Sequence, residues 1–174
     1  RGLIDNVVEV DVPKERSFMH IDTIFTQINH DHFVAFKPIV KDGLGSYVTV
    51  HRKTGEMEEY PSVRDFMQAE LSRDVSFIWS GNGESPYQER EQWTDGCNLL
   101  TIRPGVALTY DRNPKTEKAF RDAGYVAGQN LVVERRYADG KLDRLPVLAR
   151  ELAKLEPDAI VVVGPNAARA VRDA

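Results

Sequence analysis

The 174-residue sequence has little cysteine, no excess of positive charge and no long apolar run. The single cysteine, Cys97, excludes an intrachain disulfide framework and a cysteine-rich metal site, and it fits a reducing compartment. The net charge of -4 argues against nucleic acid or an anionic membrane as a partner, because both select basic surfaces. No apolar stretch approaches bilayer length, and no signal peptide opens the chain. We therefore expect a cytoplasmic protein without a nucleic-acid or membrane partner.

The composition that remains is that of a soluble globular protein. Hydrophobic residues make up 41% and charged residues 29% of the chain, which allows a real core. The length suits one domain or one and a half. The first residue is Arg1 rather than methionine, and an apparent helix over residues 167–174 stops without a cap or a glycine. These ends predict a fragment of a longer protein.

The pattern of apolar residues predicts an α/β fold whose rhythm changes near residues 110–125. Before this boundary we expect a strand-rich region with occasional helices, and after it a regular alternation of strands and helices. The predicted early strands are residues 7–12, 18–28, 33–36, 47–51, 75–79, 98–102 and 106–110. The predicted helices follow Ser62, Pro86, Asn113-Pro114, Leu145 and Gly164, and later strands cover residues 131–133 and 159–163. Residues 106–163 should form one parallel β-α-β-α-β unit.

His20 and Asp22 are the first candidates for chemistry. In a strand over residues 18–28, residues two apart point to the same face, so these two side chains should project side by side. A histidine titrates near neutral pH, and beside a carboxylate it can serve as a general acid or base. The alternative is a polar pair on a solvated strand face.

The surroundings of this pair resemble arginine deiminases over roughly residues 2–124. The matching segments occur in the order of that family and with its spacing. They are residues 18–28 (FMHIDTIFTQI), Gly81-Asn82-Gly83-Glu84, Arg90-Glu91, Asp95-Gly96-Cys97-Asn98, residues 102–106 (IRPGV) and Tyr110-Asp111-Arg112-Asn113. A lone His-x-Asp pair is a weak signal, whereas this colinear set is specific. We therefore assign residues 1–123 to an arginine-deiminase-like catalytic fragment.

The resemblance implies a fold, a reaction and two site residues. The fold would be part of an α/β propeller built from ββαβ units. The reaction would be the hydrolysis of L-arginine to citrulline and ammonia, a hydrolase step of arginine catabolism that needs neither a metal nor an organic cofactor. A cysteine thiolate attacks the guanidinium carbon, ammonia leaves, and water resolves the covalent intermediate. His20 would be the general acid and base, and Asp22 would hold the planar guanidinium. The sequence leaves open whether the chain forms a homo-oligomer.

The sequence departs from the family at the nucleophile. The resemblance places another aspartate and a glutamate upstream of Arg1, and the nucleophilic cysteine in a downstream glycine-rich segment that is not in this sequence. Cys97 is the only thiol, but it occupies a position where the family carries a small residue, so we interpret it as a packed side chain. We therefore expect this chain alone to be inactive.

His30-Asp31-His32 suggests a metal site, but the pattern does not support one. Three adjacent residues in a turn direct their side chains apart, and no fourth ligand is evident. A solvated hairpin turn is the better interpretation, so we predict no metal.

Residues 124–174 resemble a different family, the substrate-binding proteins of ABC transporters. The similar segments are residues 124–134 (GYVAGQNLVVE), 140–146 (GKLDRLP) and 157–161 (PDAIV). Such proteins have α/β lobes that close on a small ligand, and Gly164-Pro165-Asn166 would lie where such folds bind it. An ordinary turn between strand and helix is the alternative. The competing functional hypothesis is thus a non-catalytic chimera or an amino-acid-binding module.

Overall fold

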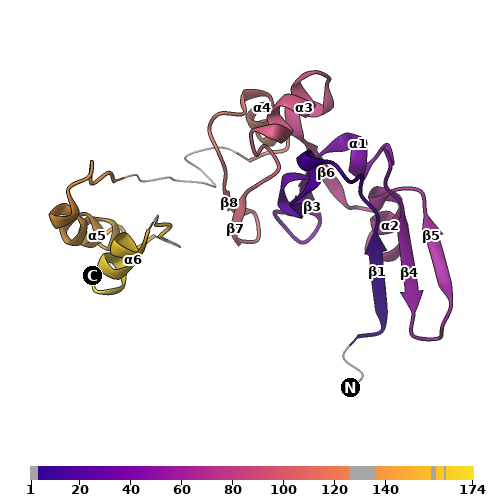
Figure 1. Cartoon of the computed structure of the whole chain (residues 1–174), viewed down its shortest axis with the longest axis horizontal. Coiled ribbons are helices and arrows are strands. Elements are labelled where there is room, and N and C mark those ends of the chain that lie inside the picture. Colours follow the sequence, from indigo (N-terminus) through magenta and orange to yellow (C-terminus); the bar gives the residue numbers. More distant parts are fainter. Residues whose placement is uncertain (1–3, 126–135, 158–159, 163) are drawn as a thin grey trace. The chain divides into compact units, whose positions relative to one another are not determined.

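The structure, a computed structural model, describes residues 4–125, 136–157, 160–162 and 164–174 (Figure 1). The chain divides into two compact units, Arg1–Leu131 and Val132–Ala174. The strands are β1 (Asn6–Val10), β2 (Phe25–Gln27), β3 (His32–Ala35), β4 (Val48–Arg52), β5 (Met57–Tyr60), β6 (Ser76–Trp79), β7 (Leu100–Arg103) and β8 (Val106–Leu108). The α-helices are α1 (Lys37–Val40), α2 (Val63–Glu70), α3 (Tyr87–Trp93), α4 (Pro114–Asp122), α5 (Leu145–Ala153) and α6 (Pro165–Arg172). The 3-10 helices are η1 (Arg16–Phe18), η2 (Ile21–Thr23), η3 (Ser80–Gly83) and η4 (Leu142–Arg144). Within these ranges no helix is long and apolar enough to cross a bilayer.

The first sheet joins β1, β4 and β5 in that order, and both pairings are antiparallel. The inner strand β4 buries Val48 and Val50, which alternation places on one face. Arg52 at the end of β4 donates two hydrogen bonds of 2.7 and 2.8 Å to Glu70 of α2 and forms an ion pair with Glu58 of β5. This ion pair network fixes α2 to the sheet. Strand β1 is an edge among the described strands, and all of its residues are exposed.

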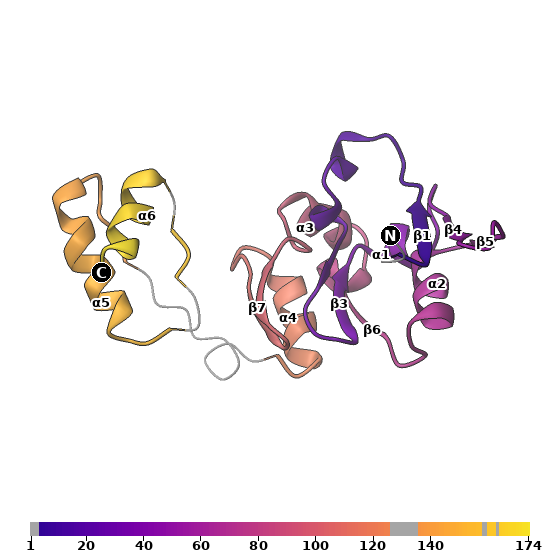
Figure 2. The same cartoon turned by 90° about the horizontal axis from the view of Figure 1, so that it is seen from below.

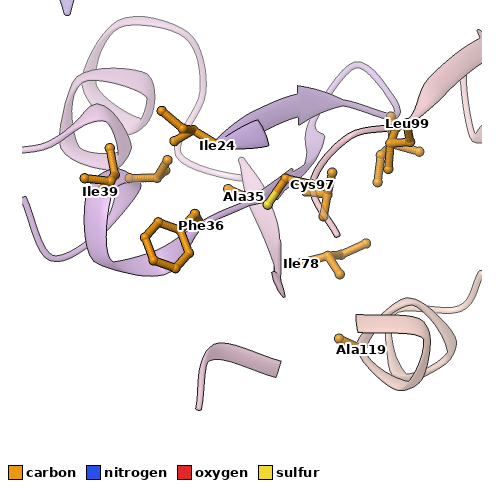
Figure 3. Packing of buried hydrophobic residues seen from close by; sticks show 11 residues of the cluster. Ile24, Ala35, Phe36, Ile39, Ile78, Cys97, Leu99 and Ala119 are labelled. Atoms are coloured by element: carbon orange, nitrogen blue, oxygen red, sulfur yellow. The ribbon is translucent and has the colours of Figure 1, made fainter. Parts of the chain in front are cut away.

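The second sheet has the order β2-β3-β6 and carries the centre of the core. Strands β2 and β3 form an antiparallel hairpin, and β3 pairs with β6 in parallel. Val34 and Ala35 of β3 are fully buried, and they pack with Ile78 of β6 and with Cys97. Figure 3 shows Ala35, Ile78 and Cys97 meeting in this core. The central strand is therefore covered by apolar side chains from several elements.

Two helices and a hairpin complete the first unit. Helices α3 and α4 lie side by side next to the turn η3 (Figures 1 and 2). In η3, Gly81 has a φ of 58°, and a Cβ there would lie 2.3 Å from the backbone nitrogen of Gln88, so only glycine fits. The β7–β8 hairpin is tied to the turn after β2 by a 2.9 Å bond from the Gly105 nitrogen to the Ile28 carbonyl.

The second unit is built around α5 and α6, which contact each other. Ala149 of α5 is 3% exposed and is the most buried apolar residue that the structure describes here. Arg136 donates a 3.3 Å hydrogen bond to Glu151 of α5. Ile160, Val161 and Val162, which precede α6, are described and form no strand.

The mixed α/β character is confirmed, and so are several local predictions. Ser62 caps α2 by accepting a 3.1 Å bond from the Asp65 nitrogen. Pro114 opens α4 as expected, and Gly124 follows its end with a φ of 87°. The hairpin between β2 and β3 also forms. The propeller of ββαβ units stays a prediction.

Two predictions on strands are wrong. The long strand over residues 18–28 is replaced by η1, η2 and the short strand β2. The parallel β-α-β-α-β unit is not found among the described residues, because β8 pairs antiparallel with β7 and residues 160–162 form no strand. The middle strand of this predicted unit, residues 131–133, lies outside the described residues. The turn Arg103-Pro104-Gly105 explains the first pairing, since a short connection joins antiparallel neighbours.

Candidate functional site

The structure places His20 and Asp22 on the 3-10 turn η2 rather than on a strand. His20 is the N-cap of η2, and Asp22 lies inside this short helix. The His20 carbonyl accepts bonds from the Thr23 backbone nitrogen at 3.1 Å and from the Thr23 hydroxyl at 2.7 Å. Both candidate side chains are exposed. The argument that strand alternation places them on one face is therefore wrong, and their assignment as site residues stays a prediction that rests on the resemblance.

The segment that carries both residues is held from the inside by α3. The Gln92 side chain is 4% exposed, and its Nε2 donates to the carbonyls of Ser17 at 2.8 Å and of Thr23 at 3.2 Å. These two carbonyls lie on either side of His20 and Asp22 in the sequence. On the same segment, Phe18 packs against the core with its ring 5.9 Å from that of Phe36. The exposed turn thus has buried attachments at both ends.

The neighbouring residue of α3 binds the start of α4. Glu91 is 5% exposed, and its carboxylate accepts bonds from the backbone nitrogens of Lys115 at 3.0 Å and Thr116 at 2.7 Å. The Thr116 hydroxyl also donates to Glu91 at 2.7 Å and accepts a 2.8 Å bond from the Gly81 nitrogen. A carboxylate at a helix N-terminus satisfies free N–H groups and complements the helix dipole. Glu91 therefore joins α3, η3 and α4 through one buried network.

Cys97 is a core residue, as predicted. Its side chain is fully buried within the apolar cluster of β3 and β6. Burial raises the pKa of the Cys97 thiol to about 12, and the neighbouring Ser80 hydroxyl opposes this effect. A thiolate is the reactive form of cysteine, so at neutral pH this side chain is protonated and inaccessible.

The His30-Asp31-His32 turn is engaged in the hairpin. The backbone nitrogen of His30 donates to the Asn29 side chain at 2.8 Å, and His32 Nδ1 lies 2.8 Å from the Tyr125 hydroxyl. In the described part of the chain, no group of three or more histidine, cysteine, aspartate or glutamate residues could hold a metal ion.

The second unit contains a shallow hollow of about 280 Å³ between α5 and α6. Leu145 and Arg150 of α5 line it together with Asn166 and Arg169 of α6. The predicted turn Gly164-Pro165-Asn166 thus contributes one residue, Asn166, to the lining of this hollow. Gly164 is the N-cap of α6.

The fold of the first unit is mixed α/β, and its exposed His-x-Asp turn is joined to a buried network on α3. The sequence model of the arginine deiminase family matches residues 1–132. Among curated proteins, the arginine deiminase of Pediococcus pentosaceus is 35% identical over 125 residues, covering 69% of this chain and 31% of that protein. The arginine deiminase of a Staphylococcus aureus strain is 35% identical over 136 residues, covering 72% of this chain and 33% of that protein. The chain belongs to the arginine deiminase family.

The comparisons also limit how much of the chain and of its relatives this assignment covers. The chain spans about a third of the length of the curated relatives that it matches. The family match ends at residue 132, close to the boundary between the two compact units. It supports the predicted deiminase region and gives no support to the resemblance of residues 124–174 to ABC-transporter substrate-binding proteins. The division into domains of residues 1–123 and 124–174 stays a prediction.

The residues that sequence reasoning missed are Glu91 and Gln92. Arg90-Glu91 is part of the sequence pattern shared with the family, but that pattern assigns Glu91 no role, and it does not include Gln92. A usable signal was present, since α3 is a short polar helix that must bury some of its polar side chains against a core. Which carbonyls and N–H groups would meet them depends on contacts with residues distant in the sequence.

Proposed function

We propose that residues 1–132 form an arginine-deiminase-type module that recognises the guanidinium group of L-arginine at the η2 turn. In this proposal Asp22 accepts hydrogen bonds from the guanidinium nitrogens, and His20 is the general acid and base. The family match that includes both residues carries the proposal. The exposure of both side chains supports it, because a ligand can reach them from solvent.

The charge and shape of the groups suit this role. A carboxylate can accept two parallel N–H bonds from a planar guanidinium fork, which an ammonium group cannot supply. An imidazole ring can both donate and accept a proton, so in this proposal His20 transfers protons to the leaving ammonia and from the attacking water. The proposed reaction is the hydrolysis of arginine to citrulline and ammonia, a step of arginine catabolism that requires no metal or organic cofactor in this family.

Hydrolysis also needs a nucleophile that this chain does not offer at the η2 turn. The only thiol is that of Cys97, which is fully buried and has a pKa of about 12. Amidines resist direct attack by water, so acid–base and binding groups alone give little turnover. We therefore propose that the chain by itself binds arginine without hydrolysing it.

A citrulline assay combined with a binding measurement tests this proposal. The purified chain should release no citrulline above a His20→Ala control. Arginine should shift the backbone amide NMR signals of His20 and Asp22. Lysine should not, since lysine carries the positive charge without the planar guanidinium group. An Asp22→Asn variant should lose the arginine response. Turnover that Cys97→Ser abolishes would place the nucleophile at Cys97, and an unchanged response in Asp22→Asn would remove Asp22 from the site.

The hollow between α5 and α6 favours a second candidate function. An amino-acid-binding module would place its ligand against Leu145, with Arg150 and Arg169 available to a carboxylate. Thermal stabilisation by aromatic or branched amino acids, with no turnover and with loss in Arg169→Gln, would favour this candidate. The absence of such stabilisation would leave the arginine-binding module as the better account.

A further inference from the structure

The turn that carries His20 and Asp22 is held by local hydrogen bonds and buries few of its side chains. The Thr23 nitrogen and hydroxyl donate to the His20 carbonyl at 3.1 and 2.7 Å, and the Ile24 nitrogen donates to the Ile21 carbonyl at 2.9 Å. The Thr23 hydroxyl also lies 3.2 Å from the Ser17 carbonyl. Met19 and Ile21, which alternate with the two candidate residues, are 67% and 63% exposed. Little burial therefore stabilises the tip of this segment, and its conformation must be set from its base.

Gln92 holds the base of this segment through a single side-chain nitrogen. An amide NH₂ carries two hydrogens, and the Gln92 Nε2 directs them at two different carbonyls, of Ser17 and of Thr23. Gln92 is 4% exposed, so its Nε2 group has little access to water and depends on these two carbonyls as its hydrogen-bond partners. One side chain thus clamps the two ends of a seven-residue segment, residues 17–23.

We propose that Gln92 is a positioning residue for His20 and Asp22, and that its two hydrogen bonds fix η2 in the form that receives the guanidinium. This inference rests on the proposed function. Gln92 lies inside the protein and acts through the backbone, so it need not touch the ligand. A segment that is already ordered loses less conformational entropy on binding, which raises affinity without a new contact.

Gln88 provides a matched control on the same helix. It lies one turn earlier on α3, is 9% exposed, and donates from Nε2 to the adjacent Glu89 at 2.9 Å rather than to the η1–η2 segment. Methionine resembles glutamine in length and flexibility but has no donor, so Gln92→Met and Gln88→Met remove the same groups from two places.

Amide hydrogen exchange by NMR measures the clamp directly. Gln92→Met should reduce the protection of the Thr23 and Ile24 amides roughly tenfold, since each lost bond contributes on the order of a factor of ten. Protection in β3, for example at Val34, should stay as in the parent chain. Gln88→Met should leave Thr23 and Ile24 unchanged. Equal losses at Val34 and at Thr23 in Gln92→Met would mean a general role in stability and would overturn the inference.

The arginine titration separates this inference from the proposed function. If the parent chain responds to arginine, Gln92→Met should weaken the affinity roughly tenfold while Gln88→Met does not. Equal affinities in the two variants would overturn the positioning role. If the parent chain shows no response, the proposed function fails, and the exchange data alone decide whether Gln92 positions the turn. Should Gln92→Met not fold, slow exchange of both Nε2 protons in the parent chain supports the clamp, and fast exchange refutes it.

Discussion

Replacing Glu91 with glutamine tests whether one buried carboxylate holds α3 and α4 together. Glu91 is 5% exposed and accepts three hydrogen bonds, from the Lys115 nitrogen, the Thr116 nitrogen and the Thr116 hydroxyl. Glutamine has nearly the same shape, but one acceptor oxygen becomes an NH₂ group. That group must then face N–H donors at the start of α4, or the side chain must turn away.

The expected loss follows from these contacts. A hydrogen bond to a charged group contributes about 1.5–3 kcal/mol, and a negative charge at a helix N-terminus adds about 0.3–1 kcal/mol. Glu91→Gln keeps one oxygen and loses at least one of the three bonds together with the charge. The free energy of unfolding should therefore fall by about 2–4 kcal/mol. A loss of this size is a large part of the stability of a domain.

Urea denaturation of the parent chain and of Glu91→Gln, followed by tryptophan fluorescence, gives the difference. Glu89→Gln is the control, because Glu89 lies on the same helix but is exposed. This control should change the free energy of unfolding by less than about 0.5 kcal/mol. If Glu91→Gln is as stable as Glu89→Gln, the three hydrogen bonds do not stabilise the packing of α3 on α4 and the reasoning fails.

Two predictions concern pH. The raised folded-state pKa of Cys97 means that its thiol contributes stability below about pH 9, which is lost as the pH rises towards about 12. The unfolding free energy of the parent chain should therefore fall relative to Cys97→Ala by up to about 1.4 kcal/mol per pH unit above pH 9, and parallel profiles would contradict this. Arg52 and then Tyr60 lower the pKa of Glu70 to about 2, so its stabilising contribution is present above pH 4.5 and lost as the pH falls towards 2. Acid titration monitored by circular dichroism should show the parent chain losing its advantage over Glu70→Gln in that window, whereas an unchanged difference would mean that the ion pair is not formed in solution.

Most helix boundaries could be predicted because their signals are local. Ser62 before α2 and Asn113-Pro114 before α4 determine where the chain can enter a helix, whatever the rest of the fold does. Strand pairing is different, because it depends on which edge a segment meets. The sequence of β8 is compatible with parallel or antiparallel partners, and only the tight turn before it selects β7.

The candidate site shows the same division between local and distant information. The His-x-Asp pattern is visible in a few residues, yet its aromatic and β-branched neighbours predicted a strand where the chain forms η2. The conformation here depends on Gln92, some 70 residues further along the chain. No periodicity within residues 18–28 contains that contact.

The adjacency of Glu91 and Gln92 restricts how the length of α3 can vary during evolution. Successive helical residues point about 100° apart, which is why one side chain reaches the start of α4 and the other the η1–η2 segment. Inserting or deleting one residue within the helix before them would rotate both side chains away from their partners at once. Point substitutions on the solvent side of α3 leave the directions of these two side chains unchanged. The helix can therefore diverge in composition much more freely than in length.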